Sequence, residues 1–190
     1  MNSRVSGRQV SEAAYLFLGA GSRAVAEVSG PQVGWCGHSD DRGIVELGGE
    51  FPARTGQRLR GPEVGCWAIA AIRRENAAHP YAGKPGSLGD ALRAAAKVAA
   101  CAGNADLKQA PRRLIAAIAM DSSGIVPLGS VDQELVQPDP ESPVGMRTDF
   151  EALWRAVSAL LAKADFLAVD LGDTGRLLAV SDYLDDVAYE

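Results

Sequence analysis

Hydrophobic positions recur at helical spacing through the middle of the chain and predict most of its helices there. The apolar, alanine-rich stretch 61–120 contains no block of charged residues, so it is the part of the chain best able to form a continuous core. A proline and a glutamate follow Gly61, which predicts a helix over 61–78 because both residue types suit a first helical turn. The same periodicity predicts helices over 87–103 and 111–120.

A further helix is predicted over 148–164, where the local signal is strongest. Thr148 and Glu151 have the spacing of a capping box, in which each side chain bonds to the backbone N–H of the other residue. Apolar residues then recur along one face of the helix up to Ala164. One of them is Trp154, which we expect to face the core or to line a ligand pocket.

Two short β-hairpins are predicted outside this helical part. The first joins 32–37 to 43–48 through a polar loop, and the second joins 166–171 to 176–180 through a Gly-Asp-Thr-Gly turn. The segment 11–28 has two interpretations. Either Ser11 caps a helix, or residues 14–18 form a buried strand that turns at Gly19-Ala20-Gly21.

These elements predict a single α+β domain over 1–190, with about four to five helices and the two hairpins joined in one small sheet. Segment 125–147 carries four prolines and no clear period, which predicts a long functional loop or a connection. Segment 182–190 is predicted to be an acidic tail. At 190 residues the chain is long enough to bury a core without disulfides or metals.

Composition and charge limit the classes of function. Hydrophobic residues make up 47% of the chain and charged residues 23%, values typical of a soluble globular protein. The net charge of -5 and the lack of a basic stripe argue against nucleic-acid binding. The sequence has neither a signal-peptide pattern nor an apolar run long enough to span a bilayer, which predicts a cytoplasmic protein without membrane contact. The bias toward arginine, alanine and glycine indicates a bacterial, GC-rich genome.

Cysteines, a histidine and two aspartates supply the first candidate site. The three cysteines are widely spaced and form no C-x-x-C pair, so neither a disulfide framework nor a zinc site is predicted. Cys36 precedes His38, Asp40 and Asp41 in the first predicted hairpin. A thiolate beside an imidazole is a nucleophile pair, so these four residues are the candidate catalytic set. The alternative is a tight turn with a solvated histidine and two turn-forming aspartates.

A second candidate site is a glycine motif. Gly19 and Gly21 match the G-x-G-x-x-A form of the dinucleotide-binding fingerprint. In that interpretation the glycines let the backbone approach a pyrophosphate, and Asp40 or Asp41 accepts hydrogen bonds from ribose hydroxyls. The alternative is a turn or a kinked helix, since the further alternating strands and helices of a doubly wound sheet are not found.

The helix predicted over 61–78 carries the remaining candidates for ligand binding. Glu75 and His79 are four residues apart and so share one face, and Arg73 beside them is suited to an anion. Trp67 is suited to the wall of a pocket. The alternatives are an exposed ion pair, a solvated arginine and a core tryptophan.

Because no strong catalytic signature is found, the sequence favours a binding or accessory protein that acts through an apolar pocket or a partner surface. Its partner is then a small molecule or another protein. The alternative is a small enzyme, of the kind found in specialised metabolism, with a sparse polar active site. Nucleotide binding through Gly19 and Gly21 is the third function considered. No metal site is predicted, and the sequence specifies neither a cofactor nor an oligomeric state.

Overall fold

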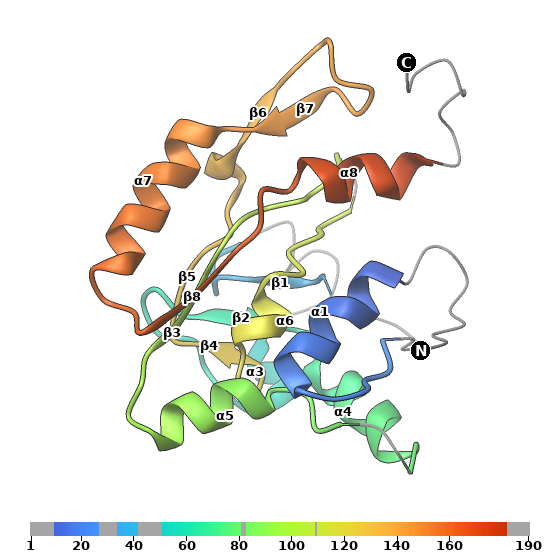
Figure 1. Cartoon of the computed structure of the whole chain (residues 1–190), viewed down its shortest axis with the longest axis vertical. Helices are drawn as coiled ribbons and strands as arrows, with labels where there is room; N and C mark the ends of the chain where they lie inside the picture. Colours follow the sequence, from blue (N-terminus) through green and yellow to red (C-terminus); the bar gives the residue numbers. More distant parts are fainter. Residues whose placement is uncertain (1–9, 27–33, 42–50, 81–82, 109, 182–190) are drawn as a thin grey trace.

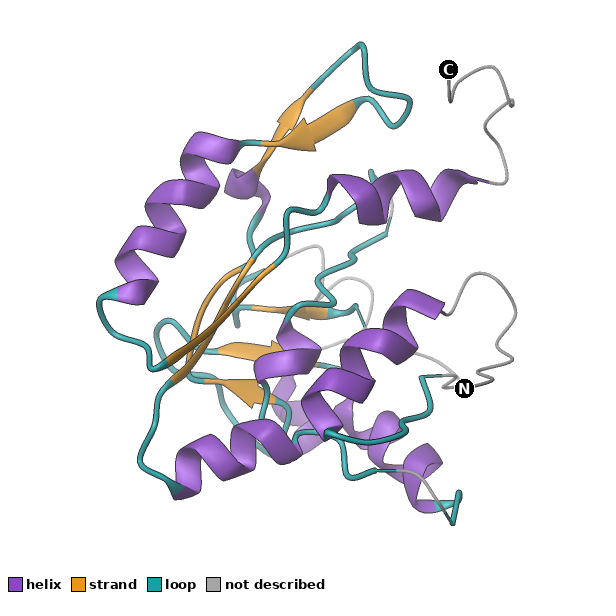
Figure 2. Cartoon of the chain, viewed as in Figure 1, coloured by secondary structure: helices purple, strands orange, loops and turns teal. Residues whose placement is uncertain are grey.

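The computed structural model has the α+β fold that the sequence predicts, with helices around three small sheets (Figures 1 and 2). It describes residues 10–26, 34–41, 51–80, 83–108 and 110–181. Within these residues there are seven α-helices, more than the four to five expected. The predicted acidic tail at 182–190 lies outside the described residues. No described helix has both the length and the hydropathy needed to cross a membrane.

Helices and strands are interspersed along the described chain. The helices are α1 (Val10–Ala20), α3 (Phe51–Thr55), α4 (Ile69–Ala77), α5 (Ser87–Ala94), α6 (Ala116–Ala119), α7 (Phe150–Leu161), α8 (Asp173–Val180) and the 3-10 helix η1 (Gln133–Leu135). The strands are β1 (Cys36–Gly37), β2 (Val64–Cys66), β3 (Ala99–Ala102), β4 (Ile125–Val126), β5 (Leu128–Ser130), β6 (Val136–Pro138), β7 (Met146–Thr148) and β8 (Phe166–Val169).

A parallel sheet with the strand order β5-β3-β8 lies at the centre of the fold. All four residues of its middle strand, Ala-Ala-Cys-Ala, are buried. Ala99 and Cys101 belong to the core that includes residues of α1 and α6, whereas Ala100 and Ala102 pack with residues of α7. Helices therefore cover both faces of the sheet, α7 on one side and α1 and α6 on the other (Figure 1).

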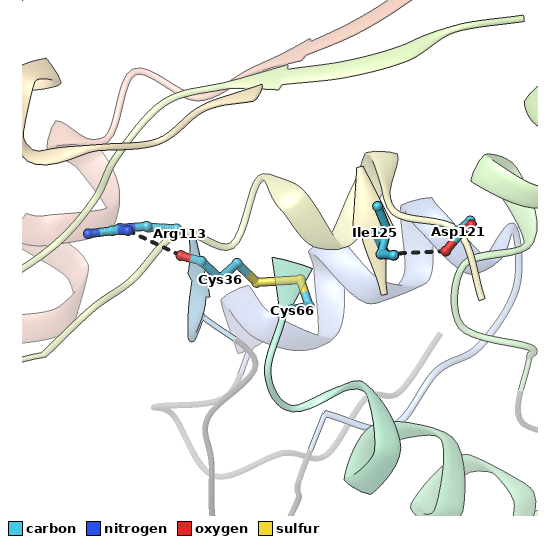
Figure 3. The surroundings of a disulfide bond; sticks show 5 residues. All are labelled: Cys36, Cys66, Arg113, Asp121 and Ile125. Carbon is cyan, nitrogen blue, oxygen red and sulfur yellow. Dashed lines mark hydrogen bonds between the residues drawn. A yellow bond between two sulfur atoms is a disulfide. The ribbon is translucent and has the colours of Figure 1, made fainter. Parts of the chain in front are cut away.

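A disulfide joins two strands of the second, antiparallel sheet, which has the order β1-β2-β4. Cys36 of β1 lies opposite Cys66 of β2 and is bonded to it (Figure 3). The expectation of no disulfide is wrong for this pair, because strand pairing joins cysteines 30 residues apart without any local sequence signal. Cys101 is free and buried, and burial raises the pKa of its thiol to about 12.

The first segment is a helix. Residues 14–18 lie within α1, so the strand interpretation is wrong, and the strand that a dinucleotide fingerprint requires is not formed there. Gly21, at φ +65°, ends the helix, and its N–H lies 3.4 Å from Leu18 O. Gly19 is buried against α6, where a Cβ atom would meet the carbonyl oxygen of Ala117. Helix termination and close packing account for both glycines.

Two predicted helices contain strands. The segment 61–78 starts as β2, which pairs with β1 and β4, and becomes helical only at Ile69. The segment 87–103 is helical only to Ala94, and a left-handed Ala96 (φ 54°) precedes β3. Alanine suits a helix better than a strand, but pairing with β5 and β8 places these alanines at the centre of a sheet. The helix predicted over 111–120 is shortened to α6.

The two predicted hairpins have different outcomes. The first falls partly on residues 32–33 and 42–50, which lie outside the described residues, and its described strand β1 pairs with β2. The second hairpin is wrong, because β8 pairs in parallel with β3 and the following segment is helix α8. The turn at Gly172 (φ 81°) leads the chain into α8 instead of back along β8. Local alternation does not reveal a parallel partner more than 60 residues away.

Helix α7 confirms the strongest sequence prediction. Its N-terminal cap is Asp149, whose Oδ1 accepts a hydrogen bond of 2.9 Å from the N–H of Ala152, while the expected cap Thr148 ends strand β7. Segment 125–147, expected as a long loop, holds β4, β5, η1 and β6 and the start of β7, which pairs antiparallel with β6.

Candidate functional site at the carboxyl edge of the parallel sheet

The carboxyl ends of β3, β5 and β8 meet along one edge of the sheet, because the three strands are parallel. We call the loops that follow them (103–106, 131–133 and 170–173) the carboxyl edge. The chain leaves β3 toward α6 on one face and leaves β5 toward α7 on the other. Such a reversal between neighbouring strands is the usual place for a ligand in an open parallel sheet.

Arg113 is the central charged residue at this edge. Its side chain is only 2% exposed and lies between two carboxylates. Arg113 Nη2 donates to Asp106 Oδ2 at 2.9 Å and Nε to the same oxygen at 3.1 Å. Nη1 donates to Asp41 Oδ2 and, at 3.3 Å, to the carbonyl oxygen of Cys36 (Figure 3). The guanidinium thus ties β1 and the loop after it to the end of β3.

Asp106 is itself buried and accepts several other hydrogen bonds. The backbone N–H of Arg112 donates to Oδ1 at 2.7 Å, and Gln133 Nε2 donates to Oδ2 at 2.8 Å. Asn104 Nδ2 donates to Asp106 Oδ2 at 3.2 Å and to the carbonyl oxygen of Val131 at 2.8 Å. These bonds link the loop after β3 to the loop after β5 and satisfy a carboxylate that would be costly to bury alone.

Arg113 stays protonated, and therefore positively charged, in the folded protein. Burial acts to lower the pKa of Arg113, but the facing carboxylates of Asp106 and Asp41 outweigh burial and raise it. Because its donors are directed at Asp106, Asp41 and the Cys36 carbonyl, Arg113 is a positioning residue of the edge.

His38 is oriented by two acceptors. Its Nδ1 lies 3.0 Å from the carbonyl oxygen of Glu63, and since a carbonyl only accepts, Nδ1 carries a proton. Its Nε2 lies 3.4 Å from Asp132 Oδ2. Burial raises the pKa of Asp132, against the lowering effect of His38 and Arg113. The Nε2 atom and the carboxylate therefore face each other at the exposed side of the edge.

A second buried arginine lies at the far end of the same edge. Arg176 is fully buried and donates from Nη1 to Asn104 O at 3.0 Å and from Nη2 to Thr148 Oγ1 at 3.1 Å. Its Nε has no hydrogen-bond partner among the residues that the structure describes. Burial lowers the pKa of Arg176, and the nearby Asp173 acts in the opposite direction.

Tyr15 of α1 forms a hydrogen bond to the loop that follows β8 at this edge. Tyr15 donates its hydroxyl proton to Asp170 Oδ2 at 2.8 Å. Burial, followed by the charge of Asp170, raises the pKa of Tyr15 well above its usual range, so the phenol stays protonated. Asp170 Oδ1 also accepts from the N–H of Gly172 at 2.8 Å, which fixes the turn into α8.

No family model, curated protein or solved structure matches this chain.

The four candidate catalytic residues are placed very differently. His38 and Asp41 lie at the carboxyl edge, one beside Asp132 and the other against Arg113. Asp40 is exposed. Cys36 is held in the disulfide, so in this state it has no free thiol, and its contribution to the edge is a carbonyl oxygen.

The two candidate tryptophans also differ in their surroundings. Trp67 is buried and packs edge-on against Phe51, with ring centroids 5.4 Å apart. Trp154 lies on the outer face of α7 and is 68% exposed, so the expectation that it faces the core is wrong, because Leu153 and Leu160 form the buried face of this helix.

The candidates Arg73, Glu75 and His79 lie on or just after α4, where Arg73 lines an open hollow described below. His79 Nδ1 is 3.9 Å from Glu75 Oε1, and both side chains are about half exposed (50% and 42%). No group of three or more histidines, cysteines, aspartates or glutamates able to hold a metal is found in the described part of the chain.

Sequence reasoning missed Arg113, Asp106, Asn104 and Asp132. Asn104 and Asp106 directly follow β3, where the sequence pattern predicts the end of a helix, and Asp132 follows β5, where the pattern predicts a loop. A buried strand followed at once by Gly-Asn-Ala-Asp was the available signal, and it becomes informative only when 99–102 is recognised as a strand.

Proposed function

We propose that the chain is a small enzyme that moves a proton between His38 and a substrate bound at the carboxyl edge. The observation that carries this proposal is the His38–Asp132 pair, in which a ring nitrogen and a carboxylate face each other across 3.4 Å. A positioned group that binds and releases a proton is what general acid–base catalysis requires. The reaction class is proton transfer to or from a polar substrate or water, as in hydrolysis or isomerisation.

Each residue has a defined role in this proposal. The Glu63 carbonyl holds the ring of His38 in one tautomer, which leaves Nε2 as the reacting atom. Asp132 stabilises the protonated ring. The Asp132 side chain is 45% exposed and that of His38 only 14%, so substrate reaches the pair from the Asp132 side. Arg113 and Asp41 position the strand and loop that carry His38.

The test uses the fact that the chain has two histidines, His38 and His79. We expect a panel of chromogenic esters, amides and phosphate esters to include a substrate whose turnover falls by about 10²- to 10⁴-fold in His38→Gln. His79→Gln is the matched control, because His79 lies on the surface away from the edge, and its turnover should be unchanged. Turnover that survives in His38→Gln would rule out the proposed role.

The His38–Asp132 pair is tested without any substrate. In ¹⁵N NMR of the imidazole rings, we expect the neutral His38 ring to be protonated at Nδ1 and the chemical shift of its Nε2 to change in Asp132→Asn, because the amide removes a negative charge beside that atom. A His38 ring protonated at Nε2, or an Nε2 resonance that is unchanged in Asp132→Asn, would contradict the pair.

A second candidate function is a binding role through a partner surface, and helix α7 supports it. Phe150, Trp154 and Leu161 are 55%, 68% and 58% exposed and lie on one stripe of the helix. Large exposed apolar stripes mark interaction sites more often than scattered residues do. Glu151 and Arg155 beside the stripe are 3.8 Å apart and cancel in charge, which suits an antiparallel second copy of the same helix.

Sedimentation velocity over a wide concentration range tests this role. We expect the wild-type chain to self-associate and Trp154→Glu to remain monomeric. Ala159→Glu adds the same charge at an exposed position on the opposite side of α7 and should leave association unchanged. A wild-type chain that stays monomeric throughout would rule out a second copy as the partner.

A further inference from the structure

An open hollow of about 590 Å³ lies beside helix α4, away from the carboxyl edge. Helix α4 forms one wall, with Ala70, Arg73, Arg74 and Ala77, and residues 83–85 contribute Lys84 and Pro85 on the other. We call it the α4 hollow. Its volume is within the range of small-molecule sites, roughly 300 to 1,000 Å³.

The charges on its walls are all of one sign. Arg73, Arg74 and Lys84 are exposed, and no carboxylate is among the residues that line the hollow. Lys84 Nζ donates to Asp90 Oδ2 at 2.7 Å, so part of its charge is already compensated. Arg73 and Arg74 have no ion pair with any described residue. In a chain with a net charge of -5, two such neighbouring arginines form a local positive site.

The backbone around the hollow is held by hydrogen bonds to one neighbouring segment. Asn76 of α4 is buried, and its amide bonds to both the N–H and the carbonyl oxygen of Val25 at 2.8 Å. The N–H of Gly83 donates to the carbonyl oxygen of Arg23, and a Cβ atom on Gly83 would collide with Ser22 Oγ. Both walls are therefore attached to the same segment, 22–25, and the cations need little backbone rearrangement to meet a ligand.

The chemistry of the walls selects a class of ligand. Each guanidinium group presents paired N–H donors that match two oxygens of a carboxylate or a phosphate, and two neighbouring arginines together suit a multiply charged anion such as phosphate better than a singly charged one. The methyl groups of Ala70 and Ala77 and the ring of Pro85 offer apolar contact for a small organic group. We propose that the α4 hollow binds a small molecule that carries a phosphate or pyrophosphate group.

Inorganic pyrophosphate is the probe that tests this site in the full chain. In ¹H–¹⁵N NMR titrations at low ionic strength, we expect shifts concentrated in α4 and residues 83–85. The variant Arg73→Gln/Arg74→Gln should weaken binding by about tenfold or more, because two charge-assisted contacts are lost. Inorganic phosphate, with fewer oxygens, should bind more weakly than pyrophosphate.

The matched control is Arg58→Gln/Arg60→Gln, which removes the same charge from two exposed arginines outside the hollow. It should change pyrophosphate affinity by less than about twofold. Equal weakening in both double variants would show attraction to net charge alone and overturn the proposal. Wild-type spectra without shifts in α4 would overturn it as well. Either result would leave the role of His38 untouched.

Discussion

The carboxyl edge and the α4 hollow both present arginine, but the surroundings of the guanidinium groups are opposite. At the edge, Arg113 is 2% exposed and lies between Asp41 and Asp106. In the hollow, Arg73 and Arg74 are exposed and have no described carboxylate partner. An arginine whose donors face carboxylates stabilises structure, whereas one without such partners is available to a ligand. The comparison predicts large effects on stability at the edge and effects on binding at the hollow.

Among the substitutions considered, replacement of Arg113 should lower the stability of the protein the most. Arg113→Met leaves Asp106 buried beside an apolar side chain, and we expect the free energy of unfolding to fall by about 3–5 kcal/mol. Urea denaturation followed by circular dichroism measures this loss. In Arg113→Met/Asp106→Asn the buried charge of Asp106 is gone and the amide oxygen still accepts a hydrogen bond, so part of the stability should return. A single variant within about 1 kcal/mol of wild type would show that the cluster is not a structural unit.

The disulfide is the next largest contribution to the edge, because it holds the strand whose Cys36 carbonyl accepts from Arg113. Reduction should lower the free energy of unfolding by about 2–4 kcal/mol, as for a closed loop of this size. The measurement compares urea midpoints with and without dithiothreitol, with thiol content checked by mass. Cys36→Ala/Cys66→Ala should be insensitive to the reductant. A reduced wild-type protein with an unchanged midpoint would contradict this prediction.

Elements that are determined locally could be predicted from the sequence, and those determined by distant pairing could not. Helix α7 has its own cap and periodicity, so its range was predicted within a few residues. Strand β3 consists of residues that favour a helix, and its strand conformation depends on β5 and β8, which follow it by 26 and more residues. The residues of the candidate site divide in the same way, into those that residue type alone identifies and those that depend on distant strand pairing. His38 and Asp41 were selected by residue type, whereas Asp132 and Arg113 required knowledge of which loops the parallel sheet brings together.

Asp90 accepts a hydrogen bond from Lys84 of the hollow, and its contribution to stability depends on pH. Burial acts to raise its pKa, but hydrogen bonds from Lys84 and Ser122 lower the pKa of Asp90 to about 2. Since the folded pKa lies below the unfolded value of 3.8, its contribution is complete above about pH 4 and is lost as the pH falls toward 2. We expect Asp90→Asn to cost about 1 kcal/mol at neutral pH, and the difference from wild type to vanish near pH 2. A pH-independent difference would indicate a packing effect.

The smallest effect on stability is expected in the hollow itself. Arg73→Gln/Arg74→Gln removes two exposed guanidinium groups that have no described ion pair, and glutamine is nearly as favourable in a helix as arginine. We expect the free energy of unfolding to change by less than about 0.5 kcal/mol, while pyrophosphate affinity falls. Urea denaturation with and without pyrophosphate separates the two quantities, because a ligand bound to the native state raises the midpoint only where its site is intact. If the double variant instead loses more than about 1 kcal/mol without ligand, these arginines stabilise the fold as Arg113 does, and the contrast between the two regions disappears.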